Sequence, residues 1–570
     1  MSTANPMPEE PATLDALAAR AHQELGAGRL PEAEATYRQI LALWPGIAEA
    51  HGNLGIVLWH QRKFEEALAQ FEQAVVLEPD LADAHNNLGN ALGGLGRLDE
   101  AASQYEQAVA LKPDYAEAHN NLANILREQG KLEEAMVRYQ QALALRPDYA
   151  DAHNNLGNAW RALGRFEEAA GCFEQALALR PNFAEAHYNL GLVLWQQDQL
   201  AEAVARFQQA VALKPDFAEA QNNLGVALRE QLKLAEARQA FERLLTIQPD
   251  SPSAQLGLAI CSLVEGDFER GWPAFEARLR MSGAGPLPNL PRWAGEPLAG
   301  RSLLLVAEQG LGDTLQFVRY VRLLKERGAR VVLACQRALG RLLESQGDWD
   351  ELFVLGSAEE WPRCDFYLPL LSAPAAFHTG TSTIPRKVPY LAADAALVAK
   401  WRRELAAVAG FKIGIAWQGS QEFSSDRRRS IPLAQFAPLA RLPGVRLISL
   451  QKGFGSEQVA AVDFPVLDLS ERLDEASGAL MDTAAVIRNL DLVVAPDTAI
   501  AHLAGALGAP VGLALQFSPN WRWLLGRDDS PWYPTMRLFR QTTPGEWSDV
   551  FGRITQAVRG LSSRDSGIID

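Results

Sequence analysis

The stretch ADAHNNLGNALGGLGRLDEAASQYEQAVALKPDY (residues 82–115) runs directly into AEAHNNLANILREQGKLEEAMVRYQQALALRPDY (residues 116–149), which has the same pattern. A proline recurs every 34 residues from Pro45 to Pro249, and an alanine column and an aromatic column keep the same step. The two columns are Ala33, Ala67, Ala101, Ala135, Ala169, Ala203 and Ala237, and Tyr37, Phe71, Tyr105, Tyr139, Phe173, Phe207 and Phe241. Small residues let two helices approach closely, the aromatic residue four positions later shares their helix face, and proline ends the second helix. The period predicts an array of helix pairs.

A period of 34 residues with these columns resembles the tetratricopeptide repeat. The chain holds about seven such repeats. The stretch from Ser251 to about Met281 keeps Phe275 but lacks the terminal proline and the alanine, as a capping repeat does. We therefore expect a tetratricopeptide superhelix, an α-solenoid, over residues 14–281.

One asparagine recurs in the first helix of each repeat, usually within H-x-N-L-G. This asparagine ladder consists of Asn53, Asn87, Asn121, Asn155, Asn189 and Asn223. A carboxamide offers both a donor and an acceptor, which suits a peptide backbone whatever its side chains. The ladder resembles that of the O-GlcNAc transferase family, which implies an extended protein in the concave groove. The alternative is that individual asparagines bond neighbouring helices. The histidines of the same motif lie 34 residues apart and are expected to be part of the repeat, not a metal cluster.

The repeat period ends near residue 281, and a proline-rich linker is expected over residues 282–300. Apolar strands then alternate with helical segments, as in SLLLVAE (302–308), ARVVLAC (329–335), FKIGIAW (411–417) and DLVVAP (491–496). Such strands are typical of parallel sheets covered on both faces. We expect an α/β region of two Rossmann-like lobes, residues 301–390 and 391–561, with ligands outside the carboxyl ends of the strands.

Three loops follow such strands. The first contains Gly310, Gly312 and Asp313, where glycines allow close backbone approach and a helix N-terminus favours an anion; a simple helix cap is the alternative for Asp313. The second, residues 417–432, holds three consecutive arginines that suit a pyrophosphate, although a charged run is commonly a solvated surface. In the third, residues 495–502, a helix begins whose N–H groups can hold phosphate oxygens.

The motifs G-L-G-D-T (310–314) and D-T-A-I-A-H-L-A-G-A-L-G (497–508) resemble the ADP-heptose heptosyltransferase family of GT-B glycosyltransferases, over roughly residues 300–560. The resemblance implies inverting sugar transfer from a nucleotide sugar, with Asp313 as general base, Gly310 and Gly312 in the acceptor loop, and residues that bind the donor. The implied donor-binding residues are Arg429, Gln451, Lys452, Asp497, Thr498, Ala499 and His502. Arg429 stands where the family more often has lysine. The tryptophan-rich segment 518–534 closes over the donor or packs the seam between the lobes.

No metal site is expected, because a helix dipole and arginines can balance the charge of a leaving nucleotide. Asp348-Trp349-Asp350 has the spacing of a metal-binding D-x-D motif, but it precedes a strand and is interpreted as a turn. The net charge of −15 disfavours nucleic acid as a partner. The four scattered cysteines, the acidic N-terminus and the lack of a long apolar run favour a cytoplasmic protein without a membrane span.

The leading hypothesis is a metal-independent glycosyltransferase with no cofactor besides its nucleotide-sugar co-substrate, which modifies a protein recruited by the repeats. One alternative is heptosyltransferase-like transfer to a lipid or polysaccharide acceptor. The other is a non-catalytic tetratricopeptide scaffold.

Overall fold

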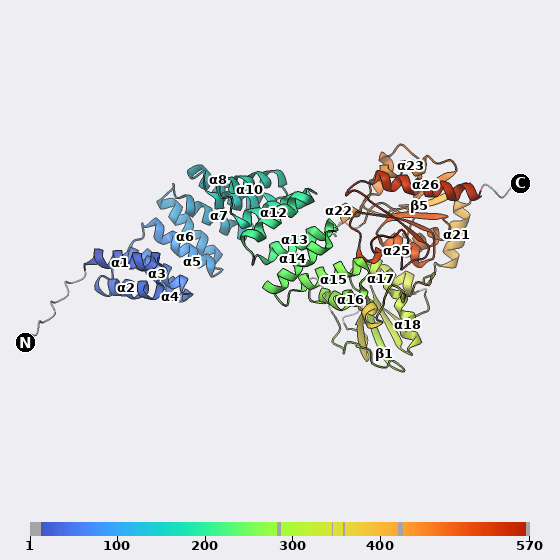
Figure 1. Cartoon of the computed structure of the whole chain (residues 1–570), viewed down its shortest axis with the longest axis horizontal. Coiled ribbons are helices and arrows are strands. Elements are labelled where there is room, and N and C mark those ends of the chain that lie inside the picture. The colour runs from blue at the N-terminus through green and yellow to red at the C-terminus, as the bar shows by residue number, and fades with distance from the viewer. Residues whose placement is uncertain (1–12, 282–286, 345, 357–359, 420–425, 566–570) are drawn as a thin grey trace, which may run out of the picture. The chain divides into compact units, whose positions relative to one another are not determined.

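The computed structural model describes residues 13–281, 287–344, 346–356, 360–419 and 426–565 (Figure 1). The chain divides into two compact units, the first ending at Ala220 and the second beginning at Gln221. The predicted domain limits stay predictions.

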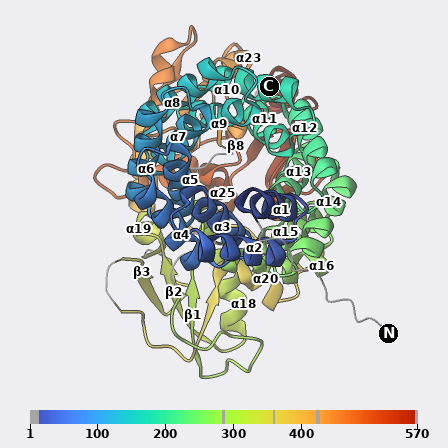
Figure 2. The same ribbon diagram turned by 90° about the vertical axis from the view of Figure 1, so that its left-hand side faces the viewer.

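The first unit is a series of helix pairs, as the 34-residue period predicts. The first helices of the pairs are α1 (Leu14–Gly26), α3 (Ala48–His60), α5 (Ala82–Gly94), α7 (Ala116–Glu128), α9 (Ala150–Ala162) and α11 (Ala184–Gln196). The second helices are α2 (Leu30–Leu43), α4 (Phe64–Leu77), α6 (Leu98–Leu111), α8 (Leu132–Leu145), α10 (Phe166–Leu179) and α12 (Leu200–Leu213). Figure 2 shows α5 to α12 following a curved path, with the odd-numbered helices on its inner side. The asparagine ladder of this unit therefore lies on helices of the concave side.

Contacts between the repeat columns explain the helix pairs. The column alanines are fully buried, and the aromatic rings are almost so. Five of the rings lie against a glycine of the first helix of their own pair, whereas Tyr37 and Tyr139 have Ala21 and Ala123 at that position; a Cβ added to Gly89 would lie 2.8 Å from the Tyr105 ring. The same contact joins Gly55 to Phe71, Gly157 to Phe173 and Gly191 to Phe207. The glycine of H-x-N-L-G thus makes room for the aromatic column.

The repeated histidines also have a structural role. The Nε2 atom of His85 lies 2.8 Å from the carbonyl oxygen of Pro79, six residues earlier. His51, His119, His153 and His187 make the same contact at 3.0 Å to Pro45, Pro113, Pro147 and Pro181. Each bond ties a first helix to the proline that ends the preceding repeat, which agrees with the interpretation of these histidines as parts of the repeat.

The second unit begins with the last helices of the solenoid. These are α13 (Ala218–Glu230), α14 (Leu234–Ile247), α15 (Pro252–Glu265), α16 (Phe268–Phe275) and the 3-10 turn η1 (Glu276–Arg280). The helices α1 to α16 together form the tetratricopeptide solenoid.

Two parallel sheets follow. The first contains β1 (Ser302–Val306), β2 (Arg330–Cys335), β3 (Glu351–Val354) and β4 (Phe366–Pro369) in the order β3-β2-β1-β4. The second contains β5 (Phe411–Ile415), β6 (Val445–Ser449), β7 (Val466–Leu467), β8 (Leu492–Pro496), β9 (Val511–Leu515) and β10 (Met536–Arg540) in the order β10-β9-β8-β5-β6-β7. Every ladder in both sheets is parallel, which confirms the prediction of parallel sheets. The edge strand β10 was not anticipated.

The D-x-D spacing belongs to a bend, as predicted. Asp350 immediately precedes β3 and accepts hydrogen bonds from the Val331 N–H at 2.7 Å and from the Lys325 ammonium at 2.6 Å. These bonds hold the start of β3 beside β2, so this carboxylate has a structural partner.

Candidate functional site

Two short helices bring the first and third predicted loops together. Helix α17 (Leu311–Phe317) follows β1, helix α25 (Ala499–Ala506) follows β8, and the two pack against each other. A Cβ added to Gly312 would lie only 2.8 Å from Cδ2 of His502. Gly312 therefore permits a close approach to its backbone, as expected for the acceptor loop. The group that lies against it is the His502 imidazole of the second lobe.

Asp313 lies at the centre of this junction. Its Oδ2 accepts a hydrogen bond from the Gly310 N–H at 3.0 Å, and its Oδ1 is paired with the guanidinium of Arg522. The first contact is that of a helix cap, one of the two predicted roles, and the second joins the two lobes. Arg522 is buried, so the pair lies at a largely enclosed position.

His502 forms the other half of the cluster, together with Asp497. Its Nε2 lies 3.4 Å from Oδ1 of Asp497, and its ring stacks on Trp523 with centroids 5.4 Å apart. Burial raises the pKa of Asp497, but the hydrogen bond from His502 and the positive charge of Arg522 outweigh it and lower that pKa. Burial lowers the pKa of His502 against the opposing effect of Asp497. We infer a neutral imidazole that donates from Nε2 to an ionised Asp497.

A buried polar chain fixes that tautomer. The Nδ1 atom of His502 lies 2.9 Å from the Tyr533 hydroxyl, which donates to it when Nε2 carries the proton. The Tyr390 hydroxyl donates to the Leu315 carbonyl at 2.7 Å and lies 3.4 Å from the Tyr533 hydroxyl. Arg319 in turn donates to the Tyr390 hydroxyl at 2.8 Å. This series of hydrogen bonds therefore runs from the first lobe to His502 in the third predicted loop.

Arg429 reaches the start of α25 from the second predicted loop. Its Nη1 donates to the Asp497 carbonyl oxygen at 3.1 Å, and its Nε donates to Asp426 at 2.8 Å. Thr498 is the N-cap residue of α25, but its side chain does not cap the helix; its hydroxyl donates to Pro496 at 3.4 Å. Arg429 therefore contacts the backbone just before the first turn of α25, where the N–H groups of Ala501 and His502 donate to the Thr498 carbonyl. Part of the second loop, residues 420–425 and the Arg427 side chain, lies outside the described residues.

Gln451 and Lys452 have partners within their own lobe. The side-chain Oε1 of Gln451 accepts from the backbone N–H groups of Trp417 and Gln418, both at 3.1 Å. Lys452 donates to the Leu473 carbonyl at 2.6 Å and pairs with Glu475 at 2.7 Å. Gln451 thus ties the loop after β6 to the loop after β5, and Lys452 ties it to the segment after β7; their donor-binding role stays a prediction.

The tryptophan-rich segment 518–534 packs the seam between the lobes, one of its two predicted roles. Trp521 stacks on Phe317 of α17 with centroids 6.2 Å apart and meets Trp272 of α16 edge-on at 5.2 Å. The same segment supplies Arg522, Trp523 and Tyr533 to the cluster. Leu524 has a φ of 53°, a conformation unusual for a non-glycine residue and typical of constrained sites.

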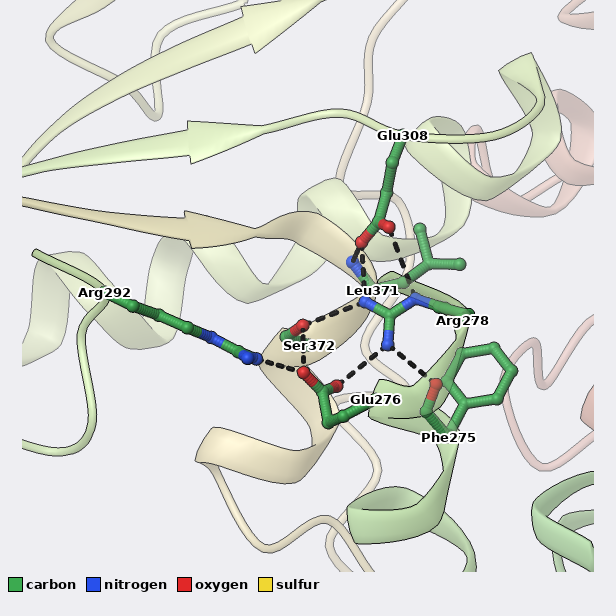
Figure 3. A network of polar contacts seen from close by, with 7 residues as sticks. All are labelled: Phe275, Glu276, Arg278, Arg292, Glu308, Leu371 and Ser372. Carbon is green, nitrogen blue, oxygen red and sulfur yellow. Dashed lines mark hydrogen bonds and ion pairs between the residues drawn. The ribbon is translucent and has the colours of Figure 1, made fainter. Parts of the chain in front are cut away.

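A buried arginine links the solenoid cap to the first lobe (Figure 3). Arg278 of η1 is 5% exposed and donates to Glu308 at 2.6 Å and to Glu276 at 2.8 Å. It also donates to the Ser372 hydroxyl at 2.8 Å, and Glu308 accepts from the Leu371 N–H at 3.1 Å. Because Glu308 immediately precedes the Gln309–Asp313 loop, the last repeat is anchored next to the candidate site.

Three asparagines of the ladder donate to an asparagine of the preceding repeat that stands one residue before that repeat's ladder position. Asn121 donates to Asn86 at 3.2 Å, Asn155 to Asn120 at 3.1 Å, and Asn189 to Asn154 at 3.0 Å. Asn53, Asn87, Asn121 and Asn155 are partly exposed, whereas Asn189 is buried. Bonding between neighbouring helices, the alternative for individual asparagines, is therefore present for these three. It orients the amides. Asn121 also donates to Asn90 at 3.2 Å and accepts from Asn120 at 3.4 Å, so much of its hydrogen-bonding capacity is used within the repeats.

Four residues of the cluster were absent from the predicted site: Arg522, Trp523, Tyr533 and Tyr390. Three of them lie in the segment 518–534, whose tryptophan and arginine content was the only signal. Tyr390 carries no local motif.

The repeats match two family models. Residues 123–160 and 157–198 match "TPR repeat", and residues 18–84, 86–139 and 188–252 match "Tetratricopeptide repeat". These parts of the chain are tetratricopeptide repeats.

Among curated proteins, the chain is 29% identical over 327 residues to Protein FlbA of Caulobacter vibrioides. The match covers 53% of this chain and 54% of that protein, so the chain spans about half the length of this relative. Among solved structures, the APC/C hetero-tetramer Cut9-Hcn1 matches with a TM-score of 0.38 and 19% identity, over 48% of this chain and 54% of that one. YrrB, described as a TPR protein with an unusual peptide-binding site, matches with a TM-score of 0.28 and 25% identity, over 32% and 95% of the two chains. Among the described residues, no helix has the length and apolar character needed to cross a membrane.

Proposed function

We propose that the chain is a glycosyltransferase that moves a sugar from a nucleotide-sugar donor to a protein held by the repeats. The observation that carries the proposal is the meeting of α17 and α25. Asp313, His502 and the Asp497–Arg429 contact lie together at the carboxyl ends of strands from two parallel sheets, where open α/β sheets bind ligands.

Asp313 acts as the general base in this proposal. Its carboxylate takes the proton of the acceptor hydroxyl while that oxygen attacks the anomeric carbon, and the bond from this carbon to the diphosphate oxygen breaks. Arg522 places a positive charge beside this carboxylate. The acceptor hydroxyl has to reach the carboxylate beside Arg522, so the pair loosens when the acceptor binds.

The leaving nucleoside diphosphate is held at the start of α25. The first-turn N–H groups and the helix dipole favour a phosphate there, and Arg429 contributes a positive charge from the adjoining loop. The bonds from Tyr533 and to Asp497 set the ring position of His502 at the same junction. These groups stabilise the leaving charge without requiring a metal ion.

The repeats recruit the protein acceptor. A primary amide has two N–H groups and two acceptor positions; the contact with the preceding repeat uses one N–H of Asn155, whereas Asn121 donates to both Asn86 and Asn90. The remaining groups suit the backbone of an extended peptide. The alternative glycosyltransferase function is transfer to a lipid or polysaccharide acceptor. In that case the repeats would bind a partner protein in place of the acceptor.

A non-catalytic scaffold is the second candidate function. It is favoured by one observation: both carboxylate oxygens of Asp313 already have partners, Gly310 and Arg522. In that case the pair serves only to hold the lobes together.

A thermal-shift screen with a panel of nucleotide sugars separates the two candidates. Binding to the folded state stabilises it by mass action, so the correct donor raises the melting temperature. Arg429→Gln should remove the shift, whereas Arg441→Gln, a change at an exposed arginine of the same lobe, should keep it. No shift with any nucleotide sugar would favour the scaffold.

A further inference from the structure

The loop that carries Asp313 lies next to the last repeat. Its residues 308–313 begin where the β1 ladder ends, since the Ala307 N–H still donates to the Ala334 carbonyl at 2.9 Å. Beyond that bond, side chains from three neighbouring segments contact the loop. One of these segments is η1, at the end of the solenoid, which supplies Arg278 (Figure 3).

Arg278 contacts Glu308, the first residue of this loop, through two parallel bonds. Its Nε donates to Oε2 at 3.3 Å, and its Nη2 donates to Oε1 at 2.6 Å. A guanidinium bound in this way fixes the orientation of a carboxylate as well as its position, which a lysine ammonium does not do. The guanidinium itself lies 4.7 Å from the centroid of the Phe275 ring and donates to the Phe275 carbonyl at 3.2 Å. The last repeat therefore sets the direction of the Glu308 side chain.

The other two segments belong to the first sheet. Oε1 of Glu308 also accepts from the N–H of Leu371 at 3.1 Å, in η4 (Leu370–Ser372) directly after β4. Gln336, directly after β2, donates to the Gln309 carbonyl at 3.3 Å and accepts from the Thr314 hydroxyl at 2.9 Å. The Glu308 carboxylate thus joins the last repeat to the first sheet at the start of the loop.

A short, constrained turn connects Glu308 to Asp313. Gln309 has a φ of 61°, a left-handed conformation that a non-glycine residue keeps only where its surroundings hold it. Gly310 follows as the N-cap residue of α17, and its N–H donates to Oδ2 of Asp313 at 3.0 Å. A rotation at Glu308 would therefore move Gly310 and, with it, the Asp313 carboxylate.

We propose that Arg278 is a positioning residue for Asp313, acting through Glu308, so that the last repeat is part of the catalytic half. The inference rests on the proposed function, in which Asp313 is the general base. A base has to lie within hydrogen-bond reach of the proton it removes, and a displacement of about 1 Å can lower the rate about 10²-fold. Donor turnover should therefore depend on Arg278 even when water is the acceptor and no protein occupies the repeats.

The test is Arg278→Lys in the full chain, which keeps the charge but loses the two parallel bonds. Release of nucleoside diphosphate is measured with the sugar that the wild type turns over fastest among UDP-, GDP-, ADP- and dTDP-linked sugars, and donor affinity is measured by calorimetry. Turnover should fall roughly tenfold to a hundredfold with donor affinity unchanged. Hydrogen exchange of residues 307–315 should become about tenfold faster or more, the effect of losing a charge-assisted bond.

The matched control is Arg301→Lys. Arg301 pairs with Asp365 at 2.9 Å in the same lobe, at the amino end of β1, and its side chain is 58% exposed. This variant should keep the turnover and the loop exchange of the wild type. If Arg278→Lys does not fold, Glu308→Gln replaces it in every measurement, because an amide oxygen can still accept the bond from Leu371.

A double-mutant cycle separates positioning from a general weakening of the fold. If Arg278 acts through Asp313, then Arg278→Lys should cause no further loss of turnover in an Asp313→Asn background. A purely structural role would instead lower turnover by the same factor in both backgrounds, and that result would overturn the proposal. Wild-type turnover together with wild-type loop exchange in Arg278→Lys would overturn it as well.

Failure of the proposed function gives a different pattern. In that case the wild type releases no nucleoside diphosphate from any of the sugars, and loop exchange alone decides the role of Arg278. Faster exchange of residues 307–315 in Arg278→Lys, with exchange of β2 unchanged, would show that Arg278 holds the loop. Unchanged exchange of the loop would exclude the positioning role.

Discussion

Replacing Arg278 with methionine should destabilise the first parallel sheet and its attachment to the last repeat. The Arg278 side chain is 3% exposed, and the carboxylates of Glu308 and Glu276 are 14% and 22% exposed. Methionine fills similar space but leaves both carboxylates without their main positive partner. Removing one partner of a buried ion pair costs about 3–5 kcal/mol. We expect a loss of this size in the free energy of opening of β1 and β4.

The assay is hydrogen exchange of β1 and β4 amides across a urea titration, read by mass spectrometry. The matched control is Arg322→Met, because the Arg322–Glu326 pair is 60% and 58% exposed, and breaking it should cost no more than about 0.5 kcal/mol. A deficit for Arg278→Met no larger than that of the control would refute the reasoning.

The same variant carries a pH test. Burial raises the pKa of Glu276, but Arg278 and Arg292 outweigh it and lower that pKa below the ordinary value of 4.5. A carboxylate with a lowered pKa stabilises the fold above its unfolded pKa, and this stabilisation is lost as the pH falls through its folded pKa. The difference between wild type and Arg278→Met should therefore narrow as the pH falls below 4.5. A constant difference across that range would assign the effect to packing alone.

Three further predictions address the site and the repeats. Gly312→Ala should lower the free energy of unfolding by about 1–3 kcal/mol, because its Cβ would lie 2.8 Å from the His502 ring, which stacks on Trp523. Gly552→Ala is the control, since the space around Gly552 is open and the change should not destabilise the fold. Equal melting temperatures of the two variants would refute this. Tyr533→Phe removes the hydroxyl at 2.9 Å from His502 Nδ1, so nitrogen NMR should show loss of a single imidazole tautomer; an unchanged spectrum would contradict the inferred chain. Changing four ladder residues together to alanine should weaken the binding of a protein acceptor by orders of magnitude, at about 1 kcal/mol for each residue, and should leave donor hydrolysis unchanged. The fold of the variant is verified by circular dichroism. Protein modification at the wild-type rate would mean that the ladder is structural. The four residues are Asn87, Asn121, Asn155 and Asn189.

The solenoid could be predicted from the sequence because its contacts are local and repeated. Most of the column aromatics meet a glycine of the same helix pair, and each repeat histidine meets a proline six residues earlier. Seven copies of one spacing make such contacts visible as columns. The strands of the sheets were predictable where they are continuous apolar runs buried on both faces. β10 was missed because Arg537 and Arg540 interrupt its apolar residues.

The candidate site could be predicted only in part. Asp313 and His502 stand in loops that follow buried strands, so their place at the sheet ends follows from the strand pattern. Arg522 pairs with Asp313 across 209 residues, and no spacing rule relates two such positions. The inter-repeat amide bonds were foreseen only as an alternative. Which amide contacts which depends on helix rotation that sequence does not specify.

The central claim is that Asp313 removes a proton during sugar transfer, and donor turnover tests it most directly. Release of nucleoside diphosphate from each of a panel of nucleotide sugars should be measured for wild type and Asp313→Asn, together with donor affinity by calorimetry. We expect release from at least one donor by the wild type, and a rate lower by about 10²–10⁴ in Asp313→Asn with donor affinity nearly unchanged. Equal rates in the two proteins, or no release and no binding of any nucleotide sugar by the wild type, would contradict the account.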